Sequence, residues 1–166
     1  MGACGKYVVH IGTSANNFTD GAVYRIIGPP APGEIVLDNL PVGQHDAARA
    51  VTGAWCVSAS GGFFGVNSLY SCGGSLDTYR WTPTLAAGVY DVFIWWTQHV
   101  NRSTSVPISV VHAGGTTTRT FNQQTGGGRW VLHGRYTFDA GPNGSVRVSD
   151  VNGQAAADAV RFVPAP

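Results

Sequence analysis

The sequence predicts an all-β protein, an antiparallel β-sandwich of jelly-roll or fibronectin-like type with essentially no helix. Apolar residues recur at every second position rather than every third or fourth, most clearly over residues 88–97. Turn-forming pairs such as Asp20 with Gly21 and Asn152 with Gly153 separate the short alternating segments. Many short strands with frequent turns are typical of two packed antiparallel sheets.

The same pattern predicts where the strands lie along the chain. They are expected at residues 7–11, 22–27, 34–37, 77–81, 89–97, 105–112, 116–123, 129–138, 145–149 and 158–163. A short helical turn is expected at residues 46–50. Residues 1–33 are expected to be an N-terminal hairpin, an extension or the remnant of a preceding module, with a proline-rich linker at 28–33. The β-sandwich domain itself is expected to cover residues 34–166.

Alternation also sorts side chains onto the two faces of each strand. In the strand at 89–97 the face predicted to be core comprises Tyr90, Val92, Ile94 and Trp96, and the opposite face comprises Asp91, Phe93 and Trp95. In the strand at 129–138 the inward set is Trp130, Leu132, Gly134, Tyr136 and Phe138. Val131 and His133 are then expected to point outward.

The outward pair Phe93 and Trp95 is the leading candidate for a ligand platform. One interpretation is an exposed surface that stacks flat, weakly polar ligands such as sugars, and the other is cover by another strand or by residues 1–27. His99, Asn101 and Arg102 follow in a loop, where planar polar groups would pair with sugar hydroxyls.

Two further aromatic positions are candidate ligand contacts. Trp55 either packs on a neighbouring disulfide or lies exposed. Phe63 and Phe64 stand between glycine pairs, so one of them is expected to point inward and the other outward.

Composition points to an extracellular or cell-surface setting. Charged residues make up 11% of the chain and the net charge is +1, whereas an average soluble protein has about 25% charged residues. No basic cluster suggests nucleic acid, and no apolar run is long enough to predict a membrane span. Cys56 and Cys72 flank a glycine-rich segment and are expected to form a disulfide; the alternative is a pair of reduced thiols. Cys4 is left without an assigned partner.

Catalytic and metal-binding patterns are weak. A catalytic pair of acids is disfavoured, because the acids lie in turns or strand motifs. No cofactor is expected. A structural calcium ion held by Asp158 with Asp150 or Asn152 is the minor alternative to a carboxylate that binds the backbone. The same two interpretations, a calcium ligand or a carboxylate that binds the backbone, apply to Asp38.

From residue 36 to about residue 163, the order of motifs resembles the golvesin C-terminal-like domain, also described as a xanthan-lyase carbohydrate-binding-like domain. The matching pieces include Gly61-Gly-Phe-Phe-Gly65, Arg80-Trp-Thr-Pro83 and Ala157-Asp-Ala-Val-Arg-Phe162. The resemblance implies a β-sandwich attached to secreted lyases, amidases and surface proteins, with a loose association with sugar binding. The Cys56 and Cys72 pair and the first 35 residues depart from the family pattern.

Together these observations favour a non-catalytic carbohydrate-binding accessory module of a secreted bacterial polysaccharide-active or surface protein. Its expected partners are a polysaccharide or oligosaccharide and the neighbouring domains of a larger chain. The second hypothesis is a structural or adhesion spacer that acts through protein contacts. A small hydrolase is the third and disfavoured hypothesis.

Overall fold

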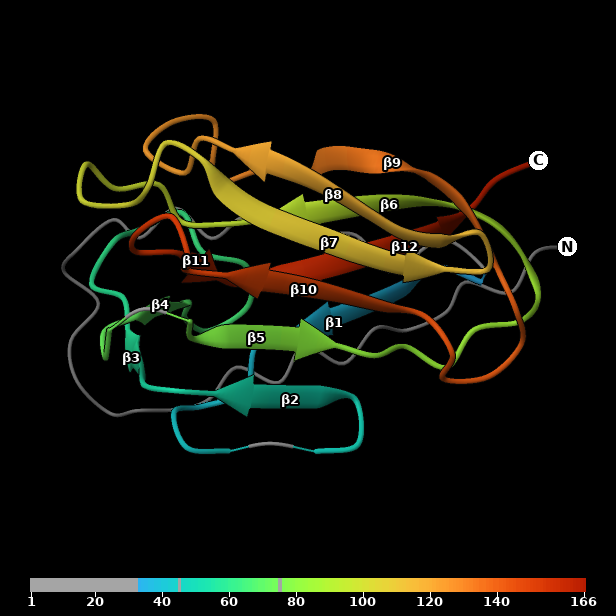
Figure 1. Ribbon diagram of the computed structural model, residues 1–166, viewed down its shortest axis with the longest axis horizontal. Coiled ribbons are helices and arrows are strands. Elements are labelled where there is room, and N and C mark those ends of the chain that lie inside the picture. Colours follow the sequence, from blue (N-terminus) through green and yellow to red (C-terminus); the bar gives the residue numbers. More distant parts are fainter. Residues whose placement is uncertain (1–32, 45, 75) are drawn as a thin grey trace, which may run out of the picture.

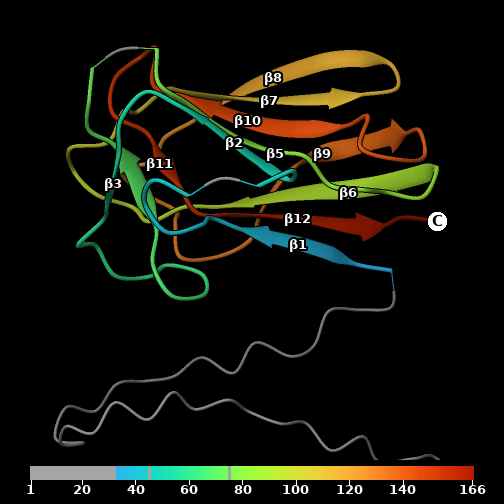
Figure 2. The same ribbon diagram turned by 90° about the horizontal axis from the view of Figure 1, so that it is seen from below.

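The computed structural model describes residues 33–44, 46–74 and 76–166. The described residues form two packed antiparallel sheets and one small third sheet, and they contain no helix. Figures 1 and 2 show the two large sheets as separate layers. The β-sandwich prediction is therefore confirmed, and none of the described residues forms a helix able to cross a membrane.

The four-stranded sheet has the order β1-β12-β6-β9. Its strands are β1 (Ile35–Asp38), β12 (Ala159–Pro164), β6 (Gly88–Trp95) and β9 (Val131–Phe138). The five-stranded sheet has the order β2-β5-β10-β7-β8. Its strands are β2 (Arg49–Thr52), β5 (Thr78–Trp81), β10 (Ser145–Ser149), β7 (Val106–His112) and β8 (Gly115–Phe121).

A third, three-stranded sheet has the order β11-β4-β3 and consists of β11 (Ala156–Ala157), β4 (Leu69–Ser71) and β3 (Trp55–Val57). Cys56 of this sheet is bonded to Cys72, which directly follows β4, so the expected disulfide is present in the structure. Cys4 lies outside the described residues, as do the strands expected at 7–11 and 22–27.

The other predicted strands all occur, with ends shifted by a few residues. The sequence pattern missed β2, β3, β4 and β11, none of which is longer than four residues. The helical turn expected at 46–50 is wrong. There Asp46 accepts a hydrogen bond from the backbone N–H of Ala48, and its backbone pairs with that of Arg49 as β2 begins. A carboxylate that binds the backbone two residues on stabilises a turn instead of a helix.

The core lies between the two large sheets. The face of β6 predicted to be apolar is buried there: Tyr90, Val92 and Ile94, together with Trp96, belong to one hydrophobic cluster. Trp81 of β5 and Phe138 of β9 join the same cluster. Strand alternation thus predicted the core face of β6 correctly.

A β-bulge in β9 reverses part of the predicted pattern. Val92 pairs with Gly134 and the next residue, Phe93, pairs with Leu132, so His133 is an extra residue without a partner on β6. Because a bulge inserts one residue, the side chains before it change faces. Leu132 is 47% exposed and His133 is buried, which corrects both predictions.

Buried His133 is held by two hydrogen-bonding contacts. One imidazole nitrogen lies 2.8 Å from the Tyr136 hydroxyl and the other lies 3.0 Å from the backbone oxygen of Ile108. Burial lowers the pKa of this imidazole. The bulge therefore places a satisfied polar ring between the sheets. It also moves Val131 to the core side and Trp130 away from it.

Candidate functional site

The candidate site begins with the outer face of the four-stranded sheet. Phe93 and Trp95 of β6 pair with Arg161 and Ala159 of β12, and all four residues share this face. Their outward orientation is as predicted. Phe93 is half-buried, with the Arg161 guanidinium 4.6 Å from the centre of its ring.

Trp95 is not an exposed platform, and that prediction is wrong. Only 6% of the residue is accessible, because the loop at 58–67 folds over it. The indole N–H donates a 2.8 Å hydrogen bond to the backbone oxygen of Gly62. The rings of Phe64 and Trp130 lie 5.7 and 5.2 Å from that of Trp95. Trp95 thus supports the loop from below, so it cannot itself stack on a ligand in this arrangement.

The covering loop is held by two acidic side chains at its base. Asp158, which is fully buried, accepts hydrogen bonds of 3.2 and 3.3 Å from the Phe64 backbone N–H. Gly65 follows with a positive φ of 63°, and a Cβ there would collide with the carboxylate of Asp38. Only glycine suits this position, because both the backbone conformation and the close carboxylate exclude a side chain.

Asp38 and Asp158 form an electrostatically coupled pair. Burial, and to a smaller extent the nearby Asp38 carboxylate, raise the pKa of Asp158 to about 8, against the opposing effect of the Phe64 backbone N–H. Burial also raises the pKa of Asp38 to about 7, against the opposing effects of the Asn39 backbone N–H and the Arg49 guanidinium. Two buried carboxylates close together disfavour full ionisation. The base of the loop is therefore sensitive to pH near neutrality.

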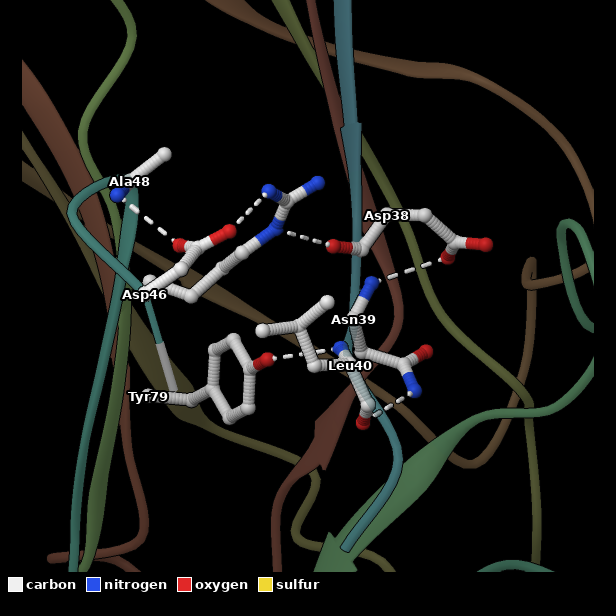
Figure 3. A network of polar contacts seen from close by, with 7 residues as sticks. Asp38, Asn39, Leu40, Asp46, Ala48 and Tyr79 are labelled. Carbon is white, nitrogen blue, oxygen red and sulfur yellow. Dashed lines mark hydrogen bonds and ion pairs between the residues drawn. The ribbon is translucent and has the colours of Figure 1, made fainter. Parts of the chain in front are cut away.

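A polar network joins Asp38 to the five-stranded sheet, as Figure 3 shows. The Arg49 side chain donates to the backbone oxygen of Asp38 at 2.9 Å and to the Asp46 carboxylate at 2.8 Å. The Leu40 backbone N–H donates to the Tyr79 hydroxyl at 3.0 Å. These bonds link the end of β1 to β2 and β5, and so fix the segment that carries Asp38.

The loop after β6 carries the polar candidates in two different environments. His99 and Asn101 are exposed, and an imidazole nitrogen of His99 lies 2.5 Å from the side-chain oxygen of Asn101. Gln124 donates from its side-chain amide to the backbone oxygens of Val100 and Arg102 at 3.0 and 2.8 Å. The hydrogen bonds from Gln124 therefore stabilise the backbone of this loop, while the side chains of His99 and Asn101 face solvent.

Arg102 is buried, in contrast to the prediction of an accessible loop residue. Only 4% of it is exposed, and its guanidinium lies 4.4 Å from the centre of the Tyr70 ring. It donates to the side chains of Ser58 and Gln154, both at 3.2 Å. Arg102 thereby ties together three loops at one end of the sandwich.

The remaining aromatic candidates also divide into buried and accessible residues. Trp55 is buried, packs edge to face against Tyr79 and donates its indole N–H to the backbone oxygen of Thr52. It is therefore a structural residue rather than an exposed one. Phe63 is 41% exposed and Phe64 is half-buried, as expected for a pair that points to opposite sides.

Trp130 belongs to this surface, although the sequence pattern assigned it to the core. It is half-buried, its ring lies 5.1 Å from that of Phe64, and Arg161 lies 5.0 Å from its centre. Simple alternation missed Trp130 because the bulge at His133 changes the parity of β9. The accessible aromatic surface therefore comprises Phe93, Phe64, Trp130 and the exposed ring of Phe63.

The residues proposed as calcium ligands bind separate parts of the backbone. Asp158 accepts from Phe64, Asp150 accepts from the N–H of Asp77 at 2.7 Å, and Asn152 donates to the oxygen of Ser105 at 2.9 Å. Within the described residues, no three histidine, cysteine or acidic side chains gather in a metal-binding group. The backbone-binding interpretation of Asp158 accounts for its contacts.

The fold defines a β-sandwich module. It matches a family 35 carbohydrate-binding module from Paenibacillus barcinonensis with a TM-score of 0.54 and 10% identity, over 79% of this chain and 99% of that one. Residues 40–164 match the family model of the golvesin C-terminal domain. The chain belongs to the golvesin C-terminal domain family, as its motifs predicted.

The chain is also similar to one part of two xanthan lyases. The chain is 38% identical over 146 residues to the xanthan lyase of Bacillus sp. (strain GL1), covering 82% of this chain and 16% of that protein. The structure of Paenibacillus xanthan lyase matches with a TM-score of 0.73 and 34% identity, over 81% of this chain and 13% of that one. The chain thus corresponds to a small part of each lyase.

Proposed function

We propose that this domain is a non-catalytic carbohydrate-binding accessory module of a secreted polysaccharide-active or surface protein. Its similarity to a small part of the xanthan lyases supports an accessory role, because most of each lyase lies outside the matched region. The observation that carries the proposal is the group of half-buried rings of Phe64, Phe93 and Trp130, beside an exposed polar loop.

The proposed contacts are the accessible rings together with two polar side chains. Phe93, Phe64 and Trp130 would stack on sugar faces, and His99 and Asn101 would bind hydroxyl groups. Aromatic rings with a few fixed polar groups are the usual elements of such sites. Trp95, Arg102 and Trp55, which the sequence made candidate contacts, act in this proposal as buried supports.

The surface is held rigidly enough to bind without large rearrangement. Gln98 accepts from the Gly127 backbone N–H at 3.1 Å, which ties the loop after β6 to the loop before β9. The Gly128 backbone N–H donates to the oxygen of Trp96 at 2.9 Å. Preorganised loops lower the entropic cost of binding a flexible sugar chain.

The placement of the acids supports a non-catalytic role. Glycoside hydrolysis requires two carboxyl groups on either side of the bond to be cleaved. The coupled acids Asp38 and Asp158 lie against the backbone of the covering loop, where Asp158 is fully buried. Asp77 and Asp150 are also buried, and both accept backbone hydrogen bonds.

Affinity electrophoresis with xanthan and a panel of neutral and acidic glycans tests the proposal. We expect at least one glycan to retard the native domain, and Trp130→Ala and Phe93→Ala to reduce that retardation. Phe121→Ala is the matched control, because it removes a half-buried ring that packs against the core from the end of β8 in the other sheet. If no glycan retards the native domain, the spacer hypothesis is favoured.

A further inference from the structure

The outer face of the five-stranded sheet is a second surface, separate from the aromatic one. Figure 1 looks onto this sheet, and Figure 2 shows that it forms the layer opposite the four-stranded sheet. The strand register places inward-facing Val146 beside Trp81, so the alternate residues Arg80 and Arg147 face outward. Both arginines are exposed.

Arg80 and Arg147 are directly opposite each other on adjacent strands. Their Cα atoms are register partners in the antiparallel pair of β5 and β10. Cβ atoms in such pairs are about 4.5–5.5 Å apart, and like charges placed directly opposite destabilise a sheet. Among the residues that the structure describes, neither guanidinium has an ion pair, a hydrogen bond or an aromatic partner.

The side chains next to this arginine pair on the outer face are small or carry hydroxyl groups. In the same cross-strand row, Ala50 lies beside Arg80 and Ser109 lies beside Arg147. Ser109 shares a 2.8 Å hydroxyl contact with Thr118 on the next strand. The register and burial of the five strands place no acidic and no aromatic side chain on their outer face. The face therefore offers two free guanidinium groups among small and hydroxyl-bearing side chains.

We propose that Arg80 and Arg147 bind the carboxylate groups of an acidic polysaccharide that lies across the five-stranded sheet. This inference rests on the proposed carbohydrate-binding function and names the glycan class. Guanidinium groups bind carboxylates through paired, charge-assisted hydrogen bonds. An anion between the two arginines would also offset their mutual repulsion. Neighbouring hydroxyls such as those of Thr118 and Thr78 can bind the hydroxyls of the same chain.

A polysaccharide fits this surface better than a nucleic acid does. The net charge of the whole chain is +1, so the positive charge is local rather than a broad basic field. Among the described residues, the outer face of these five strands also carries none of the aromatic rings on which bases stack. A face with one cationic pair and hydroxyl neighbours instead suits a sugar chain with spaced carboxylates.

Polygalacturonate and its fully methyl-esterified form are a matched pair of probes. They share one backbone and differ in whether the carboxyl groups are charged. Affinity electrophoresis with EDTA present, so that no divalent cation links the chains, would measure dissociation constants at low and high salt. We expect the native domain to bind polygalacturonate more tightly than its ester, and to lose that preference as salt screens the charges.

The decisive variant is Arg80→Gln with Arg147→Gln. We expect it to raise the dissociation constant for polygalacturonate about tenfold or more, as loss of charge-assisted hydrogen bonds implies. The matched control is Arg129→Gln with Arg135→Gln, which removes the same charge from exposed residues outside this face. We expect the control to bind like the native domain.

Arg80→Glu provides a second test that does not depend on a loss of folding. It would place opposite charges across β5 and β10, so we expect a higher melting temperature together with loss of polygalacturonate binding. Equal losses in the two double variants, or a loss in the control alone, would overturn the inference. Binding of neutral glycans without any preference for polygalacturonate over its ester would also overturn it, while leaving the proposed function intact. If the domain binds no glycan at all, both proposals fail.

Discussion

Phe64 and Trp95 pack edge to face, with ring centroids 5.7 Å apart and planes inclined at 67°. One residue comes from the loop at 58–67 and the other from the outer face of β6. Their contact turns an outward-pointing tryptophan into a buried one. At this position the loop, rather than Trp95 of the strand, is therefore the accessible part of the surface.

The first prediction concerns Trp95, the last residue of β6, and Trp96, which follows it. Trp95→Ala and Trp96→Ala should each lower the free energy of unfolding by about 3–5 kcal/mol, because both rings are buried. Denaturant titration measures both losses. Val100→Ala is the control, since that side chain is 81% exposed and its loss should have little effect. A much smaller loss for Trp95→Ala than for Trp96→Ala would mean that the loop does not cover Trp95 in solution.

The second prediction isolates the contribution of Phe64. Phe64→Ala should leave the sandwich folded but open the loop, so that solvent reaches the ring of Trp95. Hydroxyl-radical footprinting with mass spectrometry reads oxidation at each tryptophan separately. We expect oxidation of Trp95 to increase while that of Trp96, buried in the core on the opposite face, stays low. Phe63→Ala is the control, and an equal increase in that variant would argue against a specific cover by Phe64.

The third prediction concerns pH. In the folded domain the pKa of Asp158 is raised from 3.8 to about 8. The native state therefore holds this proton more tightly than the unfolded chain does, and stability falls as pH rises through this window. Asp158→Asn keeps an oxygen for the Phe64 N–H and removes the titration. The unfolding free energy of the variant minus that of the native domain should therefore increase from about pH 4 to about pH 8, because only the native domain loses stability through this titration.

Comparing the two proteins at each pH cancels the contribution of His133, whose lowered pKa acts in the opposite direction. Because the folded state keeps this imidazole neutral, the folded domain loses stability as the pH falls and the imidazole of the unfolded chain becomes protonated. A difference between native domain and Asp158→Asn that does not change with pH would contradict the raised pKa of Asp158.

The fourth prediction concerns the disulfide. Replacing Cys56 and Cys72 together by serine should lower the free energy of unfolding by about 3 kcal/mol, as expected for a closed loop of this length. Non-reducing mass spectrometry of the native domain should show a mass two hydrogens below that of the reduced chain. Two free thiols in protein prepared under oxidising conditions would contradict the observed bond.

Local alternation was sufficient for much of the fold. It predicted the fold class, most of the longer strands and the core face of β6, because period-two patterning is a property of neighbouring residues. It also placed Phe93 and Trp95 on the outer face correctly. The family motifs around Gly65 and Asp158 likewise mark residues that meet in the structure.

The accessible surface was decided by tertiary structure. Alternation says which way a side chain points, but not whether a distant loop lies on it, so the burial of Trp95 under Phe64 could not be predicted. A bulge leaves no clear mark in single-sequence periodicity, and the one at His133 moved Trp130 away from the core side. The pairing of Arg80 with Arg147 likewise depends on the register between β5 and β10, which long-range packing sets. Sequence alone thus determined the sandwich and its core, whereas contacts between distant segments determined which rings and charges reach solvent.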